Sequence, residues 1–215
     1  MPKDPHGLLN PNRKCKQLLM RHPQTESNNL AIYQGQSNTP LSPLGKEQCQ
    51  NAIAGLVAWE PEVIFSSPLD RCLSIAKPVA EQLGLELKVD DRLMELGFGI
   101  MEGLTFEEAA KRGYAFPWDI TSGDWPIEGA ESIPDFAARL ISMADYLAGH
   151  EGRVATVTHG GVVRGITNYW LQMAKEAFWS MSVLNTDSAI FSIDSAGEIY
   201  LDGFGICPEW LIDFK

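Results

Sequence analysis

Short apolar runs alternate along this chain with segments whose apolar residues recur at helical spacing. The runs CKQLLM at 15–20, PEVIFSSP at 61–68 and RVATVT at 153–158 predict buried strands, and 86–89 predicts a short fourth one. Near the C-terminus, SAIFSID and EIYLDGF flank a turn at Ala196-Gly197 and predict a β-hairpin. This order indicates an α/β protein, a three-layer α/β/α sandwich whose mostly parallel central sheet carries the hairpin as an antiparallel edge.

Helix signals lie between these runs. Ser42 is placed to cap a helix that has Pro43 in its first turn. A second helix is predicted from about Leu69 to Leu83, because Gly84 can end it, although Pro78 should kink it. Further helices are expected at about 105–111, after Ser132 and after the His159-Gly160-Gly161 turn.

Two segments stand apart from this alternation. Residues 1–14, MPKDPHGLLNPNRK, mix proline, glycine, asparagine and charge, and we expect a flexible tail in front of one domain at 15–215. The stretch from about 112 to 132 holds Trp118 and Trp125 among prolines, glycines and acids. Because long irregular segments inside a compact domain are often functional, we interpret it as a lid-like excursion over a ligand.

Composition and charge argue against several classes of function. The 215 residues include 28 acidic and 17 basic ones, and the net charge of −11 disfavours binding to nucleic acid or to an anionic membrane. No apolar run approaches the ~18 residues of a membrane helix. The four cysteines show neither CxxC spacing nor a nearby histidine cluster, which argues against a metal site and for free thiols. We therefore expect a cytoplasmic protein that needs no metal or other cofactor.

Three predicted strands end on basic or imidazole side chains. Arg21-His22 follows the first strand, Arg71 lies just beyond SSP, and His159 follows RVATVT. The carboxyl ends of parallel strands meet at one edge of the sheet, where open α/β folds bind ligands. Arg71 would lie in the first turn of a helix and Gly160 would open another, so free backbone N–H groups add to the positive charge. The cluster predicts a phosphate site in an otherwise acidic chain.

Each of these residues also has an ordinary structural interpretation. A lone arginine at the end of a strand usually contacts solvent or a surface acid, and a lone histidine there more often serves packing. The agreement of three separate strand ends is what favours a functional site.

The same residues stand in a series of recognisable motifs. LLMRHPQTESN resembles the Arg-His-Gly-x-Thr-x-x-Asn signature of the histidine phosphatase superfamily, in its phosphoglycerate mutase-like branch. Further stretches match in the family's order: QGQSNTPLSPLGKEQ, SSPLDRCLSIA, RLMELGFGIMEG, GAESIPDFAARL and VTHGGVVRG. The resemblance spans residues 17 to about 193 and implies a phosphoglycerate mutase-like fold.

The resemblance implies roles for the matching positions. His22 would be the nucleophile that becomes a phosphohistidine, and Glu95 would be the general acid that protonates the departing alkoxide. His159 would act with them at the phosphoryl group. The phosphoryl oxygens would be bound by Arg21, Asn28, Arg71 and the backbone at Gly160.

Two further side chains have less certain roles by this comparison. Ser66 would lie near the phosphate, where its hydroxyl could donate a hydrogen bond or cap the next helix. The counterpart of Glu102 serves the shape of its loop rather than the chemistry.

The signature departs from the family at two positions. Pro23 replaces the usual glycine, which removes an N–H group and favours an extended His22, yet leaves a carbonyl that can accept a hydrogen bond from the imidazole. Gln24 replaces the usual glutamate at a position without chemistry. We expect neither change to abolish activity.

The sequence therefore predicts a metal-independent phosphomonoester hydrolase for a small phosphorylated metabolite, such as α-ribazole phosphate or a sugar monophosphate. Its motifs are most similar to those of α-ribazole phosphatases and broad-specificity small-molecule phosphatases. The alternatives are a phosphoglycerate mutase-type phosphotransferase, a non-catalytic phosphate-binding domain, or a metal-dependent hydrolase, against which the adjacent arginines argue. The protein is expected to be a monomer or a homodimer.

Overall fold

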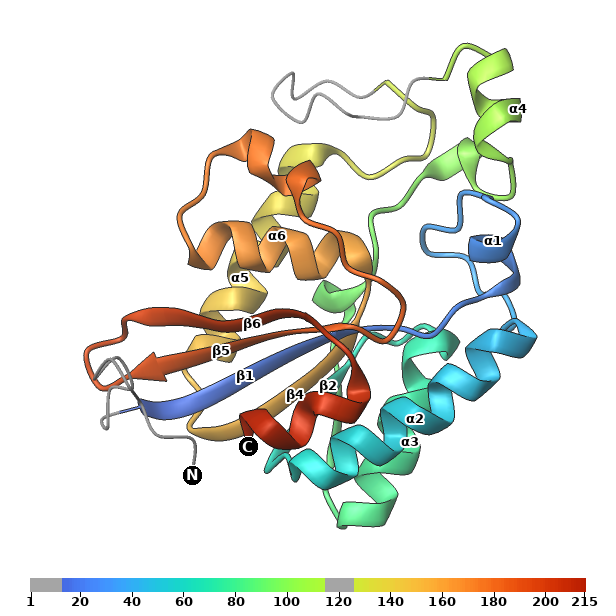
Figure 1. Ribbon diagram of the computed structural model, residues 1–215. Coiled ribbons are helices and arrows are strands. Elements are labelled where there is room, and N and C mark those ends of the chain that lie inside the picture. The colour runs from blue at the N-terminus through green and yellow to red at the C-terminus, as the bar shows by residue number, and fades with distance from the viewer. Residues whose placement is uncertain (1–12, 115–125) are drawn as a thin grey trace.

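A single six-stranded sheet organises the protein, whose computed structural model describes residues 13–114 and 126–215. The strand order is β3-β2-β4-β1-β5-β6. The strands are β1 (Arg13–Arg21), β2 (Val63–Ser66), β3 (Leu87–Val89), β4 (Gly152–Thr158), β5 (Ser188–Asp194) and β6 (Ile199–Ile206). Strands β1 to β4 are parallel, whereas β5 runs antiparallel to β1 and to β6. The predicted sheet and its antiparallel edge hairpin are confirmed (Figure 1).

Helices cover both faces of the sheet, as the sequence predicted (Figure 1). One face carries α2 (Pro43–Trp59), α3 (Asp70–Leu83) and the 3₁₀ helix η4 (Pro208–Phe214), and the other carries α5 (Ile133–Ala148) and α6 (Gly160–Trp170). The remaining short helices lie in connections: α1 (Glu26–Asn29), η1 (Asp91–Leu93), η2 (Gly99–Met101), α4 (Phe106–Lys111) and η3 (Lys175–Ser180).

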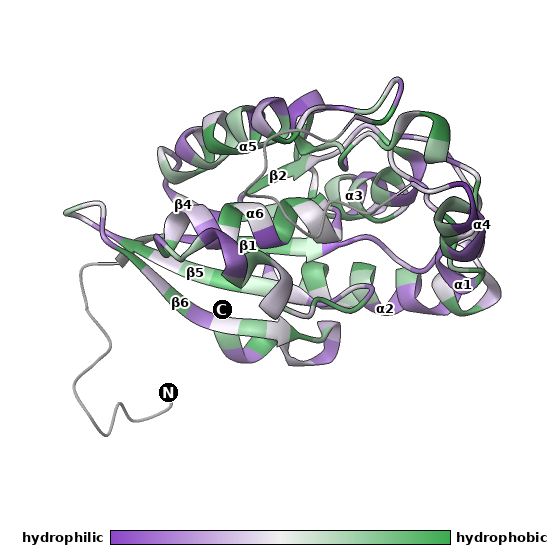
Figure 2. Ribbon diagram, turned by 90° about the horizontal axis from the view of Figure 1, so that it is seen from above, coloured by the Kyte–Doolittle hydropathy of each residue, from purple (hydrophilic) through white to green (hydrophobic). Residues whose placement is uncertain are grey.

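Strand β1 is apolar at residues 18–20, where both of its faces are buried. Leu18 and Met20 belong to the core under α2 and α3. Cys15 and Leu19, which point to the other side of the pleat, belong to the core under α5 and α6. The apolar residues of the sheet and the inward faces of the helices are green in Figure 2. Residues 17–20 are buried without interruption, and Arg21-His22 follow them at the carboxyl end of the strand.

The predicted helix boundaries follow from local capping. The Ser42 hydroxyl accepts a hydrogen bond from the Gly45 N–H group, and Pro43 occupies the first turn of α2. Helix α3 ends at Gly84, whose φ of 66° is the left-handed conformation that glycine adopts without strain. Thr105 caps α4.

Helix α3 continues through Pro78 to the predicted end at Leu83. Proline has no N–H group to offer the carbonyl four residues earlier, which belongs to Ser74. The Cys49 thiol of α2 donates to that carbonyl oxygen over 3.3 Å. A contact between helices thus replaces part of the hydrogen bond that the proline removes.

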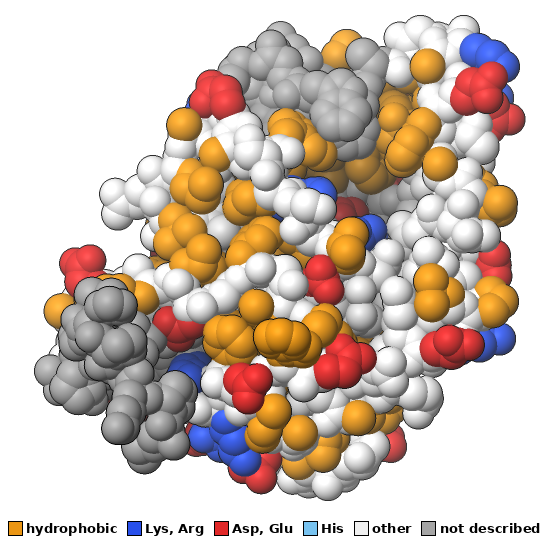
Figure 3. Space-filling model, viewed as in Figure 1, with side chains coloured by type: hydrophobic (Ala, Val, Ile, Leu, Met, Phe, Trp, Pro, Cys, Tyr) orange, Lys and Arg blue, Asp and Glu red, His pale blue; other side chains and the backbone are white. Residues whose placement is uncertain are grey.

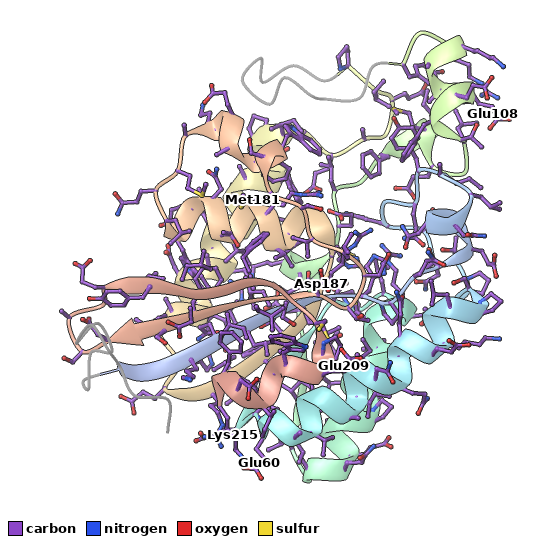
Figure 4. All side chains as sticks on the ribbon, viewed as in Figure 1. Glu60, Glu108, Met181, Asp187, Glu209 and Lys215 are labelled. Atoms are coloured by element: carbon purple, nitrogen blue, oxygen red, sulfur yellow. The ribbon has the colours of Figure 1, made fainter. Side chains whose placement is uncertain are left out.

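The C-terminal segment was not anticipated and packs beside α2. Leu211 of η4 is fully buried, and the Trp59 indole donates to the Phe214 carbonyl over 3.4 Å. Lys215 pairs with Glu60 at 2.5 Å, and the two side chains point toward each other in Figure 4.

Two predicted irregular segments lie only partly within the described residues. Strand β1 begins at Arg13, so the last two residues of the predicted tail at 1–14 belong to the sheet. Of the predicted excursion at 112–132, residues 115–125, with both tryptophans, lie outside the described ranges. Its C-terminal end is tied to the loop after Glu95, because the Glu131 N–H group donates to the Gly97 carbonyl over 3.0 Å.

Replacing Pro78 by alanine should stabilise the protein. Alanine restores the missing N–H donor and is preferred over proline in a helix interior by about 3 kcal/mol. About 1 kcal/mol of this is offset, because the unfolded chain gains conformational entropy when proline is replaced. Urea denaturation should therefore show the free energy of unfolding rise by about 1 to 2 kcal/mol. Lys77→Ala, at the exposed neighbouring position, is the control and should change it by less than about 0.5 kcal/mol. A less stable Pro78→Ala protein would contradict this account.

Candidate active site

The carboxyl ends of β1, β2 and β4 bring His22, Arg71 and His159 together. The three strands are neighbours in the sheet, and the His22 N–H group donates to the Thr158 carbonyl at the end of β4 over 2.8 Å. The His22 and His159 rings lie 5.2 Å apart between centroids. Arg71, in the first turn of α3, donates from Nε to Nδ1 of His159 over 3.3 Å. The convergence predicted from three separate motifs is what the structure shows.

The imidazole of His22 is neutral and oriented by the backbone. Its Nδ1 lies 2.7 Å from the Pro23 carbonyl oxygen. Because a carbonyl only accepts hydrogen bonds, Nδ1 carries the proton and Nε2 presents a lone pair. Burial, followed by the charges of Arg71 and Arg21, lowers the pKa of His22 well below its ordinary value of 6.5. His22 is thus a neutral potential nucleophile, with Pro23 as the acceptor that fixes its tautomer.

His159 has the opposite tautomer. Arginine only donates, so the contact from Arg71 makes Nδ1 an acceptor and leaves the proton on Nε2. That proton is donated to the Ser67 hydroxyl oxygen, 2.8 Å away. Burial and then the charge of Arg71 lower the pKa of His159 well below 6.5. Both histidines are therefore neutral in the unliganded protein.

The serine that contacts this cluster is Ser67 and not the predicted Ser66. Both are fully buried at the end of β2. The Ser66 hydroxyl donates to the Ser67 carbonyl over 2.8 Å, which uses its only proton. The Ser67 hydroxyl reaches His159 because adjacent residues of a strand point in opposite directions.

Arg71 is buried, Arg21 is half-buried, and both keep donors for an anion. Arg71 donates to the carbonyls of Gly35 and Ser37 over 2.6 and 2.9 Å. Together with its hydrogen bond to His159, these use three of its five N–H groups. Arg21 donates from Nη1 to the Val183 carbonyl over 2.7 Å, while its buried Nε has no hydrogen-bond partner among the described residues. Burial lowers the pKa of both guanidinium groups. An anion beside them would supply the missing partner.

Glu95, in the loop after η1, lies beside the N-terminus of α6. Its carboxylate accepts hydrogen bonds from the Gly161 and Leu96 N–H groups, each over 3.0 Å. A Cβ atom at position 161 would lie only 2.3 Å from the carboxylate, so glycine is required for this approach. The charge of Glu95 partly opposes the effect of burial on the pKa of Arg21 and Arg71. The predicted acid therefore lies among the predicted phosphate ligands.

Comparison with known proteins agrees with this geometry. The sequence profile of the histidine phosphatase superfamily (branch 1) matches residues 17–202. The chain belongs to this superfamily.

Similar members of the superfamily are phosphatases. Glucosyl-3-phosphoglycerate phosphatase of Mycolicibacterium vanbaalenii is 34% identical over 161 residues, covering 70% of this chain and 71% of that protein. The solved structure of mycobacterial glucosyl-3-phosphoglycerate phosphatase with VO3 is 28% identical with a TM-score of 0.75, covering 89% and 98% of the two chains. The α-ribazole phosphatase from Shigella flexneri shares the fold, with a TM-score of 0.77 at 23% identity over 88% and 96%. The chain is a phosphatase with the predicted phosphoglycerate mutase-like fold.

Asn28, the predicted neutral ligand, is held through its side-chain oxygen. Its Oδ1 atom accepts from the Thr25 N–H and hydroxyl groups, both over 3.2 Å, and from Asn185 over 3.4 Å. Asn28 also lines the cavity next to Arg21 and Glu95.

A loop at 183–187, which the sequence reasoning missed, holds Arg21 and His22 from the other side. The Arg21 N–H group donates to the Asp187 carbonyl over 3.0 Å, and the Arg21 carbonyl accepts from the Thr186 N–H group over 3.0 Å. The Asn185 side chain donates to the His22 carbonyl over 3.0 Å. Asp187 lies beside the end of β1 in Figure 4. The predicted hairpin contained the signal, because an antiparallel β5 must begin where its neighbour β1 ends.

Two charged residues support the site from outside it. Glu102 accepts hydrogen bonds from the N–H groups of Gln36, Ser37 and Phe98 over 3.0, 3.0 and 3.1 Å, which shapes the loop whose carbonyls bind Arg71. Arg139 donates to the Glu95 carbonyl over 2.9 Å and pairs with Glu131 at 2.6 Å. Glu102 thus serves its loop, as the family resemblance implied, and Arg139 was not predicted.

A cavity of about 600 Å³ opens next to Glu95, Arg21 and Asn28. Arg164 of α6 also lines it, although the sequence analysis did not single it out. Its position four residues after Gly160 was the available signal, since such residues share a helix face. Figure 3 shows hydrophobic side chains around a hollow that holds a few charged groups.

Two further observations concern the described residues only. They contain no group of three or more histidine, cysteine or carboxylate side chains placed to hold a metal ion. Their helices are all too short or too polar to cross a membrane.

Asn185→Ala should lower kcat about tenfold, since one hydrogen bond to the buried His22 carbonyl and the orientation of Asn28 depend on it. Steady-state kinetics on p-nitrophenyl phosphate would measure this. Leu184→Ala, whose side chain is 65% exposed in the same loop, should leave kcat unchanged. Equal kcat values for both variants would show that the loop does not position the nucleophile.

The two neutral histidines should make stability depend on pH. Their pKa values lie well below 6.5 in the folded protein and return to about 6.5 on unfolding, so the unfolded chain binds more protons between those values. The free energy of unfolding should therefore fall as the pH drops below 6.5, by at most about 1.4 kcal/mol per pH unit for each histidine. Urea denaturation at pH values between about 7.5 and 5 in phosphate-free buffer measures this slope. It should be smaller in His22→Gln, and an unchanged slope would assign the effect to other groups.

Proposed function

We propose that this phosphatase is a metal-independent phosphomonoester hydrolase that forms a phosphohistidine at His22. The observation that carries the proposal is the neutral imidazole, whose Nδ1–H is donated to the Pro23 carbonyl and whose Nε2 keeps a lone pair, while the charges of Arg71 and Arg21 help to lower its pKa. The substrate is a small phosphorylated metabolite.

The first step is attack of Nε2 on phosphorus. The N–P bond forms while the bond from phosphorus to the ester oxygen breaks, and Glu95, entering as the acid, gives its proton to the departing alkoxide. Arg21, Arg71 and the Asn28 amide hold the three remaining oxygens and stabilise their charge.

The second step returns the enzyme to its starting state. The Glu95 carboxylate takes a proton from water as that water attacks the phosphohistidine. The N–P bond breaks, inorganic phosphate leaves, and His22 is again neutral. The protonated Glu95 is ready for the next ester.

Positive charge for this chemistry comes from side chains of the protein. The guanidinium groups of Arg21, Arg71 and Arg164 all lie near Glu95, which influences the pKa of each. They supply the charge that a bound cation supplies in metal-dependent phosphatases. Activity should therefore persist in excess chelator.

The test is hydrolysis of p-nitrophenyl phosphate with and without EDTA, in wild type and His22→Ala. We expect equal wild-type rates in both buffers and loss of turnover in the variant. Rapid acid-free quenching after mixing with a ³²P-labelled ester should trap a base-stable, acid-labile label that His22→Ala lacks. Loss of activity with EDTA, or a label that persists in the variant, would overturn the mechanism.

Glu95→Gln gives a sharper test of the acid. An alkyl phosphate needs protonation of its leaving group, whereas p-nitrophenolate leaves without much help. The variant should lose about 10²- to 10⁴-fold in kcat on the alkyl ester and clearly less on p-nitrophenyl phosphate. Equal losses on both would remove Glu95 from the role of acid. Transfer of the phosphoryl group to an added acceptor alcohol in preference to water would instead favour the phosphotransferase alternative.

A further inference from the structure

The walls of the cavity beside Glu95 are mostly apolar. One wall comes from the segment after β1 and from the start of α4, where the Tyr33 ring lies 5.2 Å from Phe98 and 4.6 Å from Phe106. The opposite wall comes from α5 and η3 through Phe136 and Phe178. Two separate parts of the chain therefore face the same space with aromatic side chains.

Phe106 is the clearest sign that this space serves a ligand. Its side chain is 54% exposed although it borders a cavity of about 600 Å³. Such a volume is typical of sites for drug-sized ligands. Covering apolar surface that is open to water lowers the free energy, so a ligand with an apolar group would be bound here.

The position of the cavity determines which part of a substrate occupies it. Arg21, Asn28, Glu95 and Gly161 line the same cavity, so it adjoins the place where phosphorus would react. In the proposed reaction Glu95 protonates the ester oxygen. The alcohol carried by that oxygen must then extend along the apolar walls.

Several polar groups at the cavity are engaged with the protein. Arg164 donates from Nε to the Met181 carbonyl over 2.7 Å, and its guanidinium lies 5.7 Å from the Trp179 ring centre. Lys175 is exposed. Of the other polar side chains that line the cavity, three already make a hydrogen bond within the protein: Gln34 with Thr39, Asn168 with Ala174 and Tyr169 with Asp145. The cavity therefore offers few polar groups to the many hydroxyls of a sugar.

We propose that the substrates of this phosphatase are monophosphate esters of large apolar or aromatic alcohols. The inference rests on the proposed function for its assignment of the leaving group. The class of ligand follows from the cavity itself, and binding of compounds that are not hydrolysed can test it.

The experiment uses n-alkyl chains of increasing length on a constant phosphorus group. Kd values of n-alkylphosphonates from ethyl to hexyl are measured by calorimetry, and kcat/KM values are measured for the matching alkyl phosphates. Burial of one methylene contributes about 0.8 kcal/mol, so each added carbon should lower Kd and raise kcat/KM about three- to fourfold. The kcat/KM for hexyl phosphate should exceed those for phosphoserine and glucose 6-phosphate.

A matched pair of variants locates the effect. Phe106→Ser should flatten the dependence of Kd on chain length. Val89→Ser removes a side chain that is 50% exposed on β3 and does not line the cavity, and should leave that dependence unchanged. Equal slopes in the two variants would place the apolar contact elsewhere and overturn the assignment.

The outcomes separate this inference from the proposed function. A chain-length dependence in Kd without turnover of any ester would reject the hydrolase and keep the ligand class. Hydrolysis with no dependence on chain length, or with a preference for phosphoserine or glucose 6-phosphate, would reject the ligand class and keep the hydrolase.

Discussion

Buried positive charge at the carboxyl edge of the sheet is the constraint on which the rest of the site depends. Arg71 is buried and Arg21 half-buried beside two imidazoles, and a further positive charge there would be repelled in a medium of low dielectric constant. His22 and His159 consequently remain neutral. The same condition that would bind a phosphoryl group therefore also keeps the proposed nucleophile, His22, in its neutral form.

Because neutral imidazoles have two tautomers, their hydrogen-bond partners determine what each ring can do. The Pro23 carbonyl places the proton of His22 on Nδ1, and Arg71 places that of His159 on Nε2. The substitution of proline for glycine in the signature is compatible with this arrangement, since the site uses the carbonyl at position 23.

The site depends on three loops that are far apart in the sequence. The 183–187 loop holds the backbone of Arg21 and His22, Glu102 shapes the loop that binds Arg71, and Arg139 holds the segment around Glu95. Each contact is a hydrogen bond to a backbone group or a salt bridge that is largely shielded from water. The side chains of the predicted site can thus be kept in place although most of them follow the ends of strands and belong to connections.

The sequence by itself determined the sheet, its main helices and the residues that meet at its carboxyl edge. Apolar runs buried on both faces are long enough to predict strands, Ser42 and Gly84 have local capping preferences, and the motifs around His22, Arg71, Glu95 and His159 need no contact information. Only the tertiary structure showed that Ser67, and not the predicted Ser66, contacts His159, because one step along a strand reverses the direction of a side chain. It also revealed Asn185 and Arg164, whose partners lie more than 15 residues away in the chain. The apolar cavity is likewise a feature that only the tertiary structure revealed, since its two walls come from segments that meet only when the sheet and its helices are assembled.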